Sequence, residues 1–382
     1  MNIRPLATLL LVWALGARSD VYAVDWQALP PNTWVPIKPV LVQPDGSDDR
    51  GTWVQAGWNK LVFDADGKRV LFYDRWVDKK HGGDTIYGNC LYSFEPDSAK
   101  LIPIKIANWV KEPKPGGGYA TKPLPENAQE PTPCDRHVYH AFEWVPDLKE
   151  IFICNGANQT AVRDEKVVGH KEVNDTWRFG LEQKVWKKVD SQQHPANHLE
   201  DGMGYCPDTK AIVYAGHGKI WILDLASGQW RPAKNNLPRA HMGMSVFYDG
   251  PRKRMLLVGG GAYGAWTTRA GGFNGLYAFD PRTETVSALA DCPTALCRGA
   301  LAHDTQRDLF VTAAVMPKKE GVEQPSGVFC YDPKRNEWKE IKSANAIPAT
   351  GWMPLCYDAV HDCFIGMGSG KTFHAFRPAL EK

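Results

Sequence analysis

The sequence predicts an all-β protein, a six-bladed β-propeller whose ring is closed by a strand from near the N-terminus. Three observations lead to this fold class. A strand–turn–strand pattern recurs six times, five of the six are followed by an apolar pair spaced seven residues apart, and the last lacks its final strand. The 35 Gly and 28 Pro of the chain are typical of many short strands joined by turns.

The recurring pattern consists of two short strands joined by a turn that contains Asp, Gly or Pro, as in LVFDADGKRVLFY. Its six occurrences are residues 61–73, 141–156, 203–216, 244–261, 301–314 and 355–368. A third strand then carries an aromatic or Leu residue, and an apolar residue follows seven positions later in a fourth strand. The five complete pairs are Phe94 with Leu101, Phe179 with Trp186, Leu223 with Trp230, Phe279 with Val286, and Tyr331 with Trp338. Each unit therefore supplies four strands, the composition of one propeller blade.

The closing strand is predicted from the sixth unit. That unit has Phe376, but the chain ends at Lys382, one residue short of the matching position. The stretch NTWVPIK at 32–38 reads like NEWKEIK at 336–342, which is a fourth strand of the pattern. A propeller has no free sheet edge only when its last blade is complete. We therefore expect residues 33–38 to pair with the strand around His374 to Arg377, with Trp34 in the slot that Trp338 fills in the fifth unit.

These features resemble kelch repeats. The Gly triplet at 259–261, the aromatic residue of the third strand and the Trp of the fourth carry the resemblance, which covers essentially all of residues 24–382. It implies a single kelch-like propeller domain, similar to the central domain of galactose oxidase. Residues 107–136 are rich in Pro and Gly, and we interpret them as a loop inserted into this domain. Kelch propellers include enzymes, glycan-binding proteins and protein-interaction platforms, so the resemblance implies a fold and selects no activity.

The first residues predict export. Residues 1–23 combine Arg4, a short apolar run at 6–15 and the cleavage-site pattern Val21-Tyr22-Ala23, as in a secretory signal peptide. The apolar run is too short to span a membrane. We expect a secreted or periplasmic, monomeric protein without a membrane span. The net charge of +2, with no basic tail, argues against a nucleic-acid partner.

The nine Cys of an exported chain permit disulfides. Cys292 and Cys297 bracket a loop that contains Pro, and Cys356 and Cys363 flank a predicted hairpin turn. Either pair is sterically reasonable as a disulfide, and buried free thiols fit the sequence equally well. The odd count leaves at least one thiol unpaired.

Loop lengths indicate where a binding site lies. The first-to-second and third-to-fourth turns of each unit are tight, so the long connections gather at the opposite face, and long loops on a rigid scaffold tend to carry function. They are residues 74–89, 157–173, 262–273 and 316–326 within units, and 107–136, 190–200 and 343–351 between units.

Arg, His and Trp residues collect at this face, and those that precede the first strands should converge on the mouth of the central channel. Arg presents forked donors to carboxylate or sulfate, and indole rings stack on sugars. The predicted ligand-binding residues are Arg75, Trp76, His81, Arg136, His137, His140, His198, Arg239, His241, Trp266, Arg298 and Trp352. In kelch repeats, an Arg or His before the first strand often caps loops between blades instead.

We expect the long-loop face to bind a glycan, which could be anionic, or a protein partner. The alternative is a carbohydrate-active enzyme, a polysaccharide lyase or a sugar epimerase, at the same mouth. In that alternative His140 or His198 is the base, Tyr263 the acid and Arg239 the group that neutralises the uronate.

The sequence identifies no cofactor, but two features are compatible with zinc or copper. His140, His198 and His241 come from consecutive units at similar depth and could bind zinc or copper. The stretch 138–141 is similar to the galactose oxidase segment in which Tyr and His bind copper, which implies Tyr139 and His140 as ligands. The rest of that pattern is missing, because no matching position supplies the second Tyr and no further domain supplies the last His.

Overall fold

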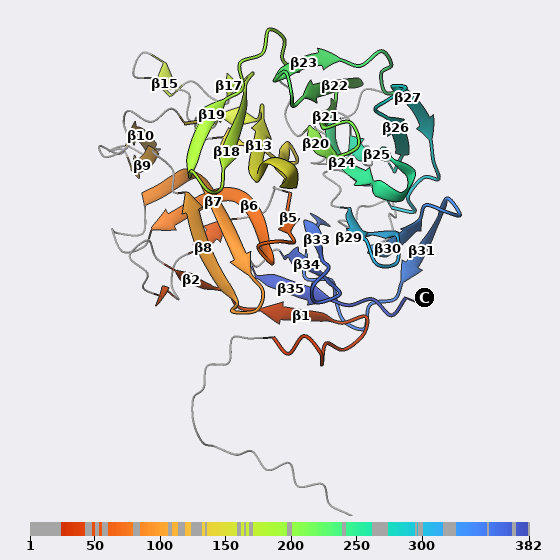
Figure 1. Ribbon diagram of the computed structural model, residues 1–382. Helices are drawn as coiled ribbons and strands as arrows, with labels where there is room; N and C mark the ends of the chain where they lie inside the picture. Colours follow the sequence, from red (N-terminus) through yellow and green to blue (C-terminus); the bar gives the residue numbers. More distant parts are fainter. Residues whose placement is uncertain are drawn as a thin grey trace, which may run out of the picture.

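The computed structural model of the chain is a ring of antiparallel sheets around a central axis (Figure 1). It describes residues 24–42, 48–49, 53–55, 60–78, 85–105, 109–113, 119–123, 132–133, 136–158, 162–163, 166–167, 171–196, 201–238, 242–261, 274–294, 296, 301–315, 326–349, 351–368 and 372–380. The predicted signal peptide lies outside these residues and stays a prediction. Within them, no helix has the length and apolar character needed to cross a membrane.

Six blades make up the ring. In each blade the strands follow one another in order from the axis to the outside. They are, in blade one, β5 (Val62–Asp64), β6 (Arg69–Asp78), β7 (Thr85–Glu95) and β8 (Lys100–Lys105); in blade two, β12 (Phe142–Val145), β13 (Glu150–Cys154), β18 (Thr176–Gly180) and β19 (Val185–Lys188); in blade three, β20 (Gly202–Cys206), β21 (Ala211–Gly216), β22 (Lys219–Asp224) and β23 (Gln229–Pro232). The others are, in blade four, β24 (Met242–Asp249), β25 (Arg254–Gly261), β26 (Leu276–Asp280) and β27 (Thr285–Ala288); in blade five, β28 (Ala302–Asp304), β29 (Leu309–Val315), β30 (Gly327–Asp332) and β31 (Glu337–Ile341); and in blade six, β33 (Leu355–Asp358), β34 (Cys363–Met367), β35 (Phe373–Phe376) and β1 (Trp34–Ile37). The all-β, six-bladed prediction is confirmed.

The turn between the first two strands has the same backbone geometry in every blade. It ends at a non-Gly residue in the left-handed region, with φ between 49° and 57°: Lys68, Lys149, Lys210, Lys253, Asp308 and Asp362. In blades two and four the turn contains a short 3-10 helix, η2 (Pro146–Leu148) and η3 (Gly250–Arg252). Proline in the first turn of each suits the fixed φ of a helix start.

The N-terminal strand closes the ring, as predicted. Trp34 of β1 lies opposite Phe376 of β35, with ring centroids 4.4 Å apart. On the other edge of β1 the side-chain amide of Asn345 accepts a hydrogen bond from Trp34 N at 2.8 Å and donates one to Trp34 O at 2.9 Å. The amide therefore satisfies backbone groups that an outer strand otherwise leaves unpaired.

Trp34 occupies the register position of the outer-strand residue in the other blades. The register partners at this position are Phe94 and Leu101, Phe179 and Trp186, Leu223 and Trp230, Phe279 and Val286, Tyr331 and Trp338, and Phe376 and Trp34. The seven-residue spacing therefore identified five of the equivalent pairs, and the likeness of residues 32–38 to 336–342 identified the sixth.

Six hydrophobic clusters form the described core, one at each junction between neighbouring blades. The closing strand takes part in two of them. Trp34 packs at the junction of blades five and six, and Ile37 packs at the junction of blades six and one. Alternate faces of a strand point in opposite directions, so one short strand joins both junctions.

Two segments predicted as loops contain strands in blade one. Most of the predicted loop 74–89 belongs to the extended ends of β6 and β7, which continue beyond the blade after a register shift. The predicted insert 107–136 contains a hairpin of β9 (Trp109–Pro113) and β10 (Tyr119–Pro123), and β9 pairs with β7. On the other side β4 (Trp53–Gln55) pairs with β6. The sequence missed this accessory sheet because β4 and β9 pair with strands that do not adjoin them in the chain.

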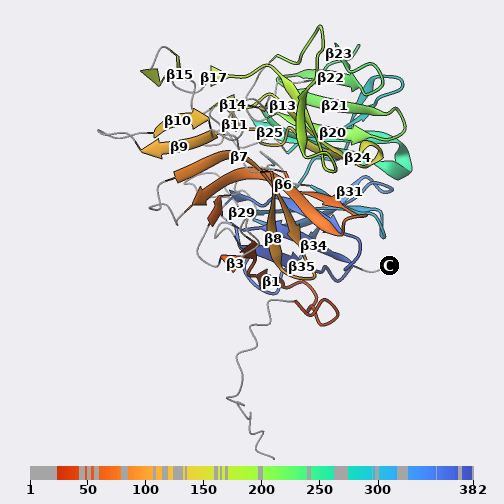
Figure 2. The ribbon, with the colours of Figure 1, turned by 60° about the vertical axis from the view of Figure 1, so that its left-hand side comes forward.

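Blade two carries smaller additions at the same end of the ring. β11 (Arg136–His137), β14 (Ala157–Asn158) and β17 (Lys171–Glu172) form one small sheet, and β15 (Val162–Arg163) pairs with β16 (Lys166–Val167). Figure 2 shows β9, β10, β15 and β17 projecting from one side of the molecule. The remaining short strands are β2 (Val40–Val42), β3 (Asp48–Asp49) and β32 (Gly351–Trp352).

The disulfide considered between Cys356 and Cys363 is not formed. Cys356 lies opposite Ile365 and Cys363 lies opposite Asp358, so the two thiols are diagonal neighbours on β33 and β34. Diagonal neighbours on antiparallel strands are farther apart than directly opposed ones, which disfavours a disulfide. Cys292 is a buried free thiol, and Cys297 lies outside the described residues.

Candidate functional site

The two ends of the ring differ in how the chain connects its strands. One end, the tight-turn rim, holds the short turns between first and second and between third and fourth strands. The other, the long-loop face, holds the connections between second and third strands and between blades, including the accessory strands of blades one and two. Blade three departs from this pattern, because only His217 and Gly218 separate β21 from β22.

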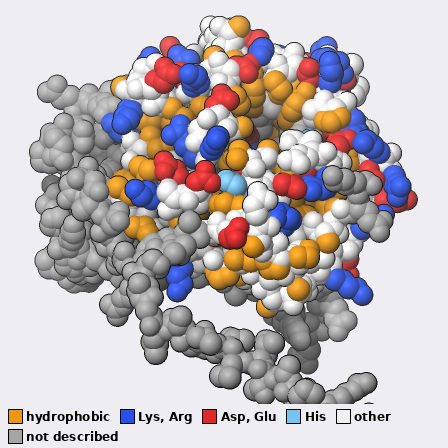
Figure 3. Space-filling view, turned by 60° about the horizontal axis from the view of Figure 1, so that its bottom comes forward, with side chains coloured by type: hydrophobic (Ala, Val, Ile, Leu, Met, Phe, Trp, Pro, Cys, Tyr) orange, Lys and Arg blue, Asp and Glu red, His pale blue; other side chains and the backbone are white. Residues whose placement is uncertain are grey.

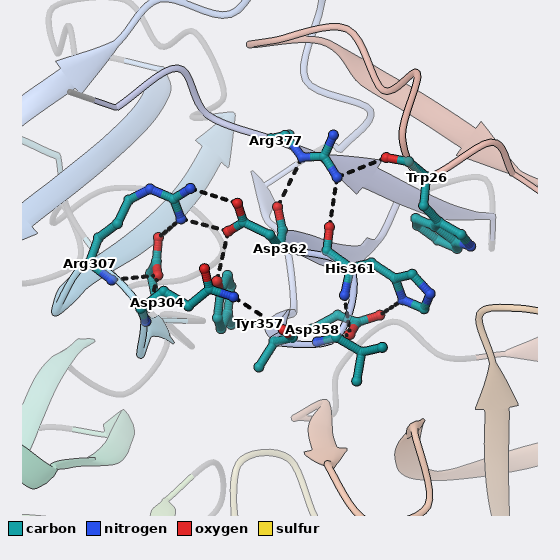
Figure 4. A network of polar contacts seen from close by, with 11 residues as sticks. Trp26, Asp304, Arg307, Tyr357, Asp358, His361, Asp362 and Arg377 are labelled. Carbon is teal, nitrogen blue, oxygen red and sulfur yellow. Dashed lines mark hydrogen bonds and ion pairs between the residues drawn. The ribbon is translucent and has the colours of Figure 1, made fainter. Parts of the chain in front are cut away.

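Ion pairs cross from blade to blade along the tight-turn rim. Arg307 of blade five contacts Asp304 in its own turn at 2.8 Å and Asp362 of blade six at 2.6 Å (Figure 4). Tyr357 also donates a hydrogen bond to Asp362 at 2.8 Å. The Arg307 guanidinium is the main cause that lowers the pKa of the Asp362 carboxyl.

The same network ties the N-terminal segment to blade six. Arg377 donates hydrogen bonds to the carbonyl oxygens of Trp26 at 2.8 Å and His361 at 2.7 Å (Figure 4). The His361 ring stacks on Trp26 at 4.4 Å between centroids. Its two nitrogens lie 2.6 Å from Asp358 and 2.8 Å from Asp97 of blade one. Arg377 and His361 therefore hold Trp26 against blade six, and His361 also joins blade six to blade one.

Similar pairs continue around the other blades. Arg252 of blade four contacts Asp308 of blade five at 2.8 Å, and Tyr205 of blade three donates to Asp147 of blade two at 2.9 Å. Lys210 also pairs with Asp147. On the face drawn in Figure 3, basic side chains are interspersed with acidic ones. Arg252, Arg307 and Lys210 are therefore already paired with carboxylates of this chain.

A buried ion pair lies at the axis. Lys60 precedes β5 in blade one, and its ammonium group contacts the carboxylate of Glu143 on β12 of blade two. The ammonium also donates hydrogen bonds to Met203 O on β20 at 2.9 Å and to Val246 O on β24 at 3.2 Å. The side chains of Lys60 and Glu143 are only 7% and 13% exposed. One side chain thus joins the first strands of blades one to four.

Burial dominates the electrostatics of Glu143. Desolvation raises the pKa of its carboxyl above the ordinary value, while Lys60 and the backbone N–H groups of Trp144 and Tyr205 act in the opposite direction. Trp144 N lies 3.2 Å from the carboxylate. The buried ions are therefore both paired and hydrogen-bonded, as a low-dielectric site requires.

The sequence reasoning missed Lys60 and Glu143, although the repeat carried a signal. Counted eight residues back from the left-handed turn residue, Lys60 corresponds to Ala141, Gly202, Ser245, Ala300 and Pro354. Counted six residues back, Glu143 corresponds to Val62, Gly204, Phe247, Ala302 and Cys356. Both charged residues stand where the other blades have small, Ser or apolar residues.

His140 lies on the long-loop side of this ion pair. It is 2% exposed, and its Nδ1 is 2.6 Å from Ser245 Oγ of blade four. Its carbonyl oxygen accepts a hydrogen bond from Met203 N of blade three at 3.1 Å. His140 thus links blades two, three and four below the mouth, and its predicted role as a base or metal ligand stays a prediction.

A buried polar chain joins blades two and three near the mouth. The Arg136 side chain has no exposed area, pairs with Asp175 and donates to Asn155 O at 3.2 Å. Asn155 Nδ2 donates to Tyr214 Oη at 2.9 Å, and Tyr214 donates to Asp201 at 2.7 Å. Burial raises the pKa of Tyr214, which keeps its hydroxyl protonated as a donor. Arg136 therefore supports the loops through Asp175 and Asn155, and its predicted role in ligand binding stays a prediction.

For four other predicted ligand-binding residues the structure describes the backbone. Arg75 and Trp76 lie in the extension of β6, opposite Gln55 and Tyr87 respectively. The other two are His137 in β11, opposite Ala157, and Trp352 in β32, opposite Ala314. The remaining predicted site residues lie outside the described residues, and their roles stay predictions: His81, His198, Arg239, His241, Tyr263, Trp266 and Arg298.

The metal hypothesis is not tested by the described residues. Among them, no group of three or more His, Cys, Asp and Glu side chains is placed to hold a metal ion. Two of the three proposed ligands, His198 and His241, lie outside the described residues.

No protein-family model matches the chain, and no curated protein matches it either. The propeller arrangement therefore rests on the strand pairing of the structure itself.

Proposed function

We propose that the protein is an exported, monomeric kelch-like propeller that binds an acidic glycan on its long-loop face. The observation that carries this proposal is the contrast between the two ends of the ring. At the tight-turn rim, Arg252, Arg307 and Lys210 are paired with carboxylates of the chain. The accessory strands of blades one and two build up the opposite end.

The direct contacts are proposed for residues of the mouth and the accessory strands. Arg75, Arg239 and Arg298 supply forked donors for carboxylate or sulfate groups. The aromatic residues Trp76, Trp266 and Trp352 supply faces for sugar rings, and His81, His137, His198 and His241 supply further donors. Arg136 and His140 hold the underlying loops and strands through Asp175 and Ser245.

A glycan array tests the proposal. It carries uronate-containing fragments of pectin, alginate and ulvan beside neutral oligosaccharides of similar length. We expect binding to the acidic fragments, and loss of that binding in the variant that combines Arg239→Ala with His241→Ala. Thermal melting of this variant should match the wild type, because we predict that Arg239 and His241 lie in a loop outside the core.

The same samples decide between the competing outcomes. Absence of binding to every acidic fragment contradicts the proposal and leaves a protein partner as the candidate for this face. Absorbance from unsaturated uronates that accumulates with time would instead identify a polysaccharide lyase at the same mouth. Full binding by the double variant would place the site elsewhere on the molecule.

A further inference from the structure

The axial ion pair has the composition of a primary-ammonium binding site. An ammonium group has three N–H donors and no acceptor. Lys60 Nζ has three acceptors around it: the Glu143 carboxylate, Met203 O at 2.9 Å and Val246 O at 3.2 Å. The Phe247 ring lies 5.0 Å away, within the range of a cation–π contact. Donors and acceptors therefore match one to one.

The acceptors are held by the first strands of three blades. A Cβ atom on Gly204 would lie 2.8 Å from Val246 O, and one on Gly202 would lie 2.3 Å from Met244 O. Only glycine allows β20 and β24 to approach so closely. This approach lets carbonyl groups from two blades reach the same nitrogen atom, so the site is part of the packed axis.

We propose that the first strands of blades two, three and four form a primary-ammonium site, and that Lys60 of blade one is its tethered ligand. The inference goes beyond the proposed glycan site, because it concerns the axis and a different ligand class. It also means that all three N–H donors of the Lys60 ammonium are engaged. A free alkylammonium ion should bind once the tether is removed.

The chemistry of the site favours an ammonium ion over a metal ion. Calcium takes six to eight oxygen ligands, often from several carboxylates, whereas the described acceptors include one carboxylate and two carbonyl groups. A single positive charge balances Glu143. n-Propylammonium matches Lys60→Ala best, because it restores the three carbons and the nitrogen that the substitution deletes.

The test is rescue of Lys60→Ala by this ion, measured by thermal melting at constant ionic strength. We expect the melting temperature to rise with n-propylammonium concentration and to saturate, as a ligand that binds only the folded state requires. Tetramethylammonium and potassium chloride, which lack N–H donors, should give much smaller shifts. The wild type and the exposed-lysine control Lys149→Ala should not respond to any of the three salts.

A second variant connects the rescue to Glu143. In Lys60→Ala combined with Glu143→Gln, the apparent affinity for n-propylammonium should fall at least about tenfold, because a charge-assisted hydrogen bond is lost. If Lys60→Ala does not fold alone, the yield of refolding with and without n-propylammonium replaces melting as the measurement. Equal responses to n-propylammonium and tetramethylammonium, or no response in either measurement, would overturn the proposal.

Discussion

The axis and the tight-turn rim of this propeller both use ion pairs, but they use them differently. At the rim the pairs are many, partly exposed and related from blade to blade, as between Arg307 and Asp362 and between Arg252 and Asp308. Among the described residues at the axis, the buried pair of Lys60 with Glu143 has no counterpart in the other blades. Loss of one rim pair leaves the others in place, whereas loss of one axial partner leaves a buried charge.

In this propeller the ion pairs that recur from blade to blade lie at the rim, and the pair without a counterpart lies at the axis. Repeated positions of the rim stabilise the ring by many small contributions. The axial pair breaks the repeat, and it joins four blades through Met203 and Val246 as well as Glu143. Both sets of ion pairs depend on a closed ring. Substitutions that open the ring should therefore lower the free energy of unfolding most.

Trp34→Gly should be the most destabilising single substitution. It removes a 3% exposed indole from the junction of blades five and six and weakens the closing strand. We expect a loss of about 4–6 kcal/mol in the free energy of unfolding, from the cavity and from the glycine. Denaturant unfolding measures it, with Val35→Ala in the same strand as control. An unchanged midpoint would contradict closure by this strand.

Lys60→Met should cost about 3–5 kcal/mol, because it leaves Glu143 buried without its partner. Combining it with Glu143→Leu should recover most of this loss, since two apolar side chains then replace the buried pair. Denaturant unfolding of both single variants and the double variant gives the coupling energy. Additive effects would show that the two residues act independently, and the contrast with the rim would fail.

Asp362→Asn should cost about 1 kcal/mol at neutral pH, because the Asp362–Arg307 pair is partly exposed. The folded-state pKa of Asp362 is lowered, chiefly by Arg307, so its contribution is present above the unfolded pKa of about 3.9 and is lost as pH falls through the folded value. The stability difference between wild type and variant should therefore be constant from neutral pH to about 5 and shrink below about 4. A stability difference that grows on acidification would contradict a lowered folded-state pKa for Asp362.

Lys149→Ala should have no measurable effect on stability. Lys149 and Glu182 form an ion pair on the exposed rim, with side chains 61% and 63% exposed. Solvent and salt screen such pairs. Thermal melting at low and high salt checks this prediction. A clear loss of stability at both salt concentrations would show that even an exposed rim ion pair contributes substantially to the stability of the fold.

The sequence predicted the features that repeat and missed those that do not. The repeat left one outer-strand position empty in the sixth unit, and the likeness of residues 32–38 to 336–342 placed Trp34 opposite Phe376. In the accessory sheet, β4 pairs with the end of β6 and β9 pairs with the end of β7. No local sequence pattern indicates these pairings. Lys60 and Glu143 lie 83 positions apart, so only the closed ring brings them together.

For the binding site, the sequence predicted which residue types lie near the mouth. It did not predict whether their side chains are free to contact a ligand. Arg136 was expected at the mouth, but its guanidinium is directed to Asp175 and the carbonyl of Asn155. An Arg before a first strand can either contact a ligand or hold a loop, and only the position of a carboxylate such as Asp175 decides between them. The sequence resemblance to kelch repeats had left both roles open.

The central claim, that the long-loop face binds an acidic glycan, is tested most directly by two charge-matched variants. One combines Arg239→Ala with Arg298→Ala, two residues predicted to lie at the mouth. The other combines Lys149→Ala with Lys210→Ala on the tight-turn rim, so each variant removes two positive charges. Calorimetric titration with the acidic oligosaccharide selected on the array should show affinity reduced at least about tenfold in the first variant and unchanged in the second. Equal affinities in both variants, or a loss confined to the rim variant, would contradict the account.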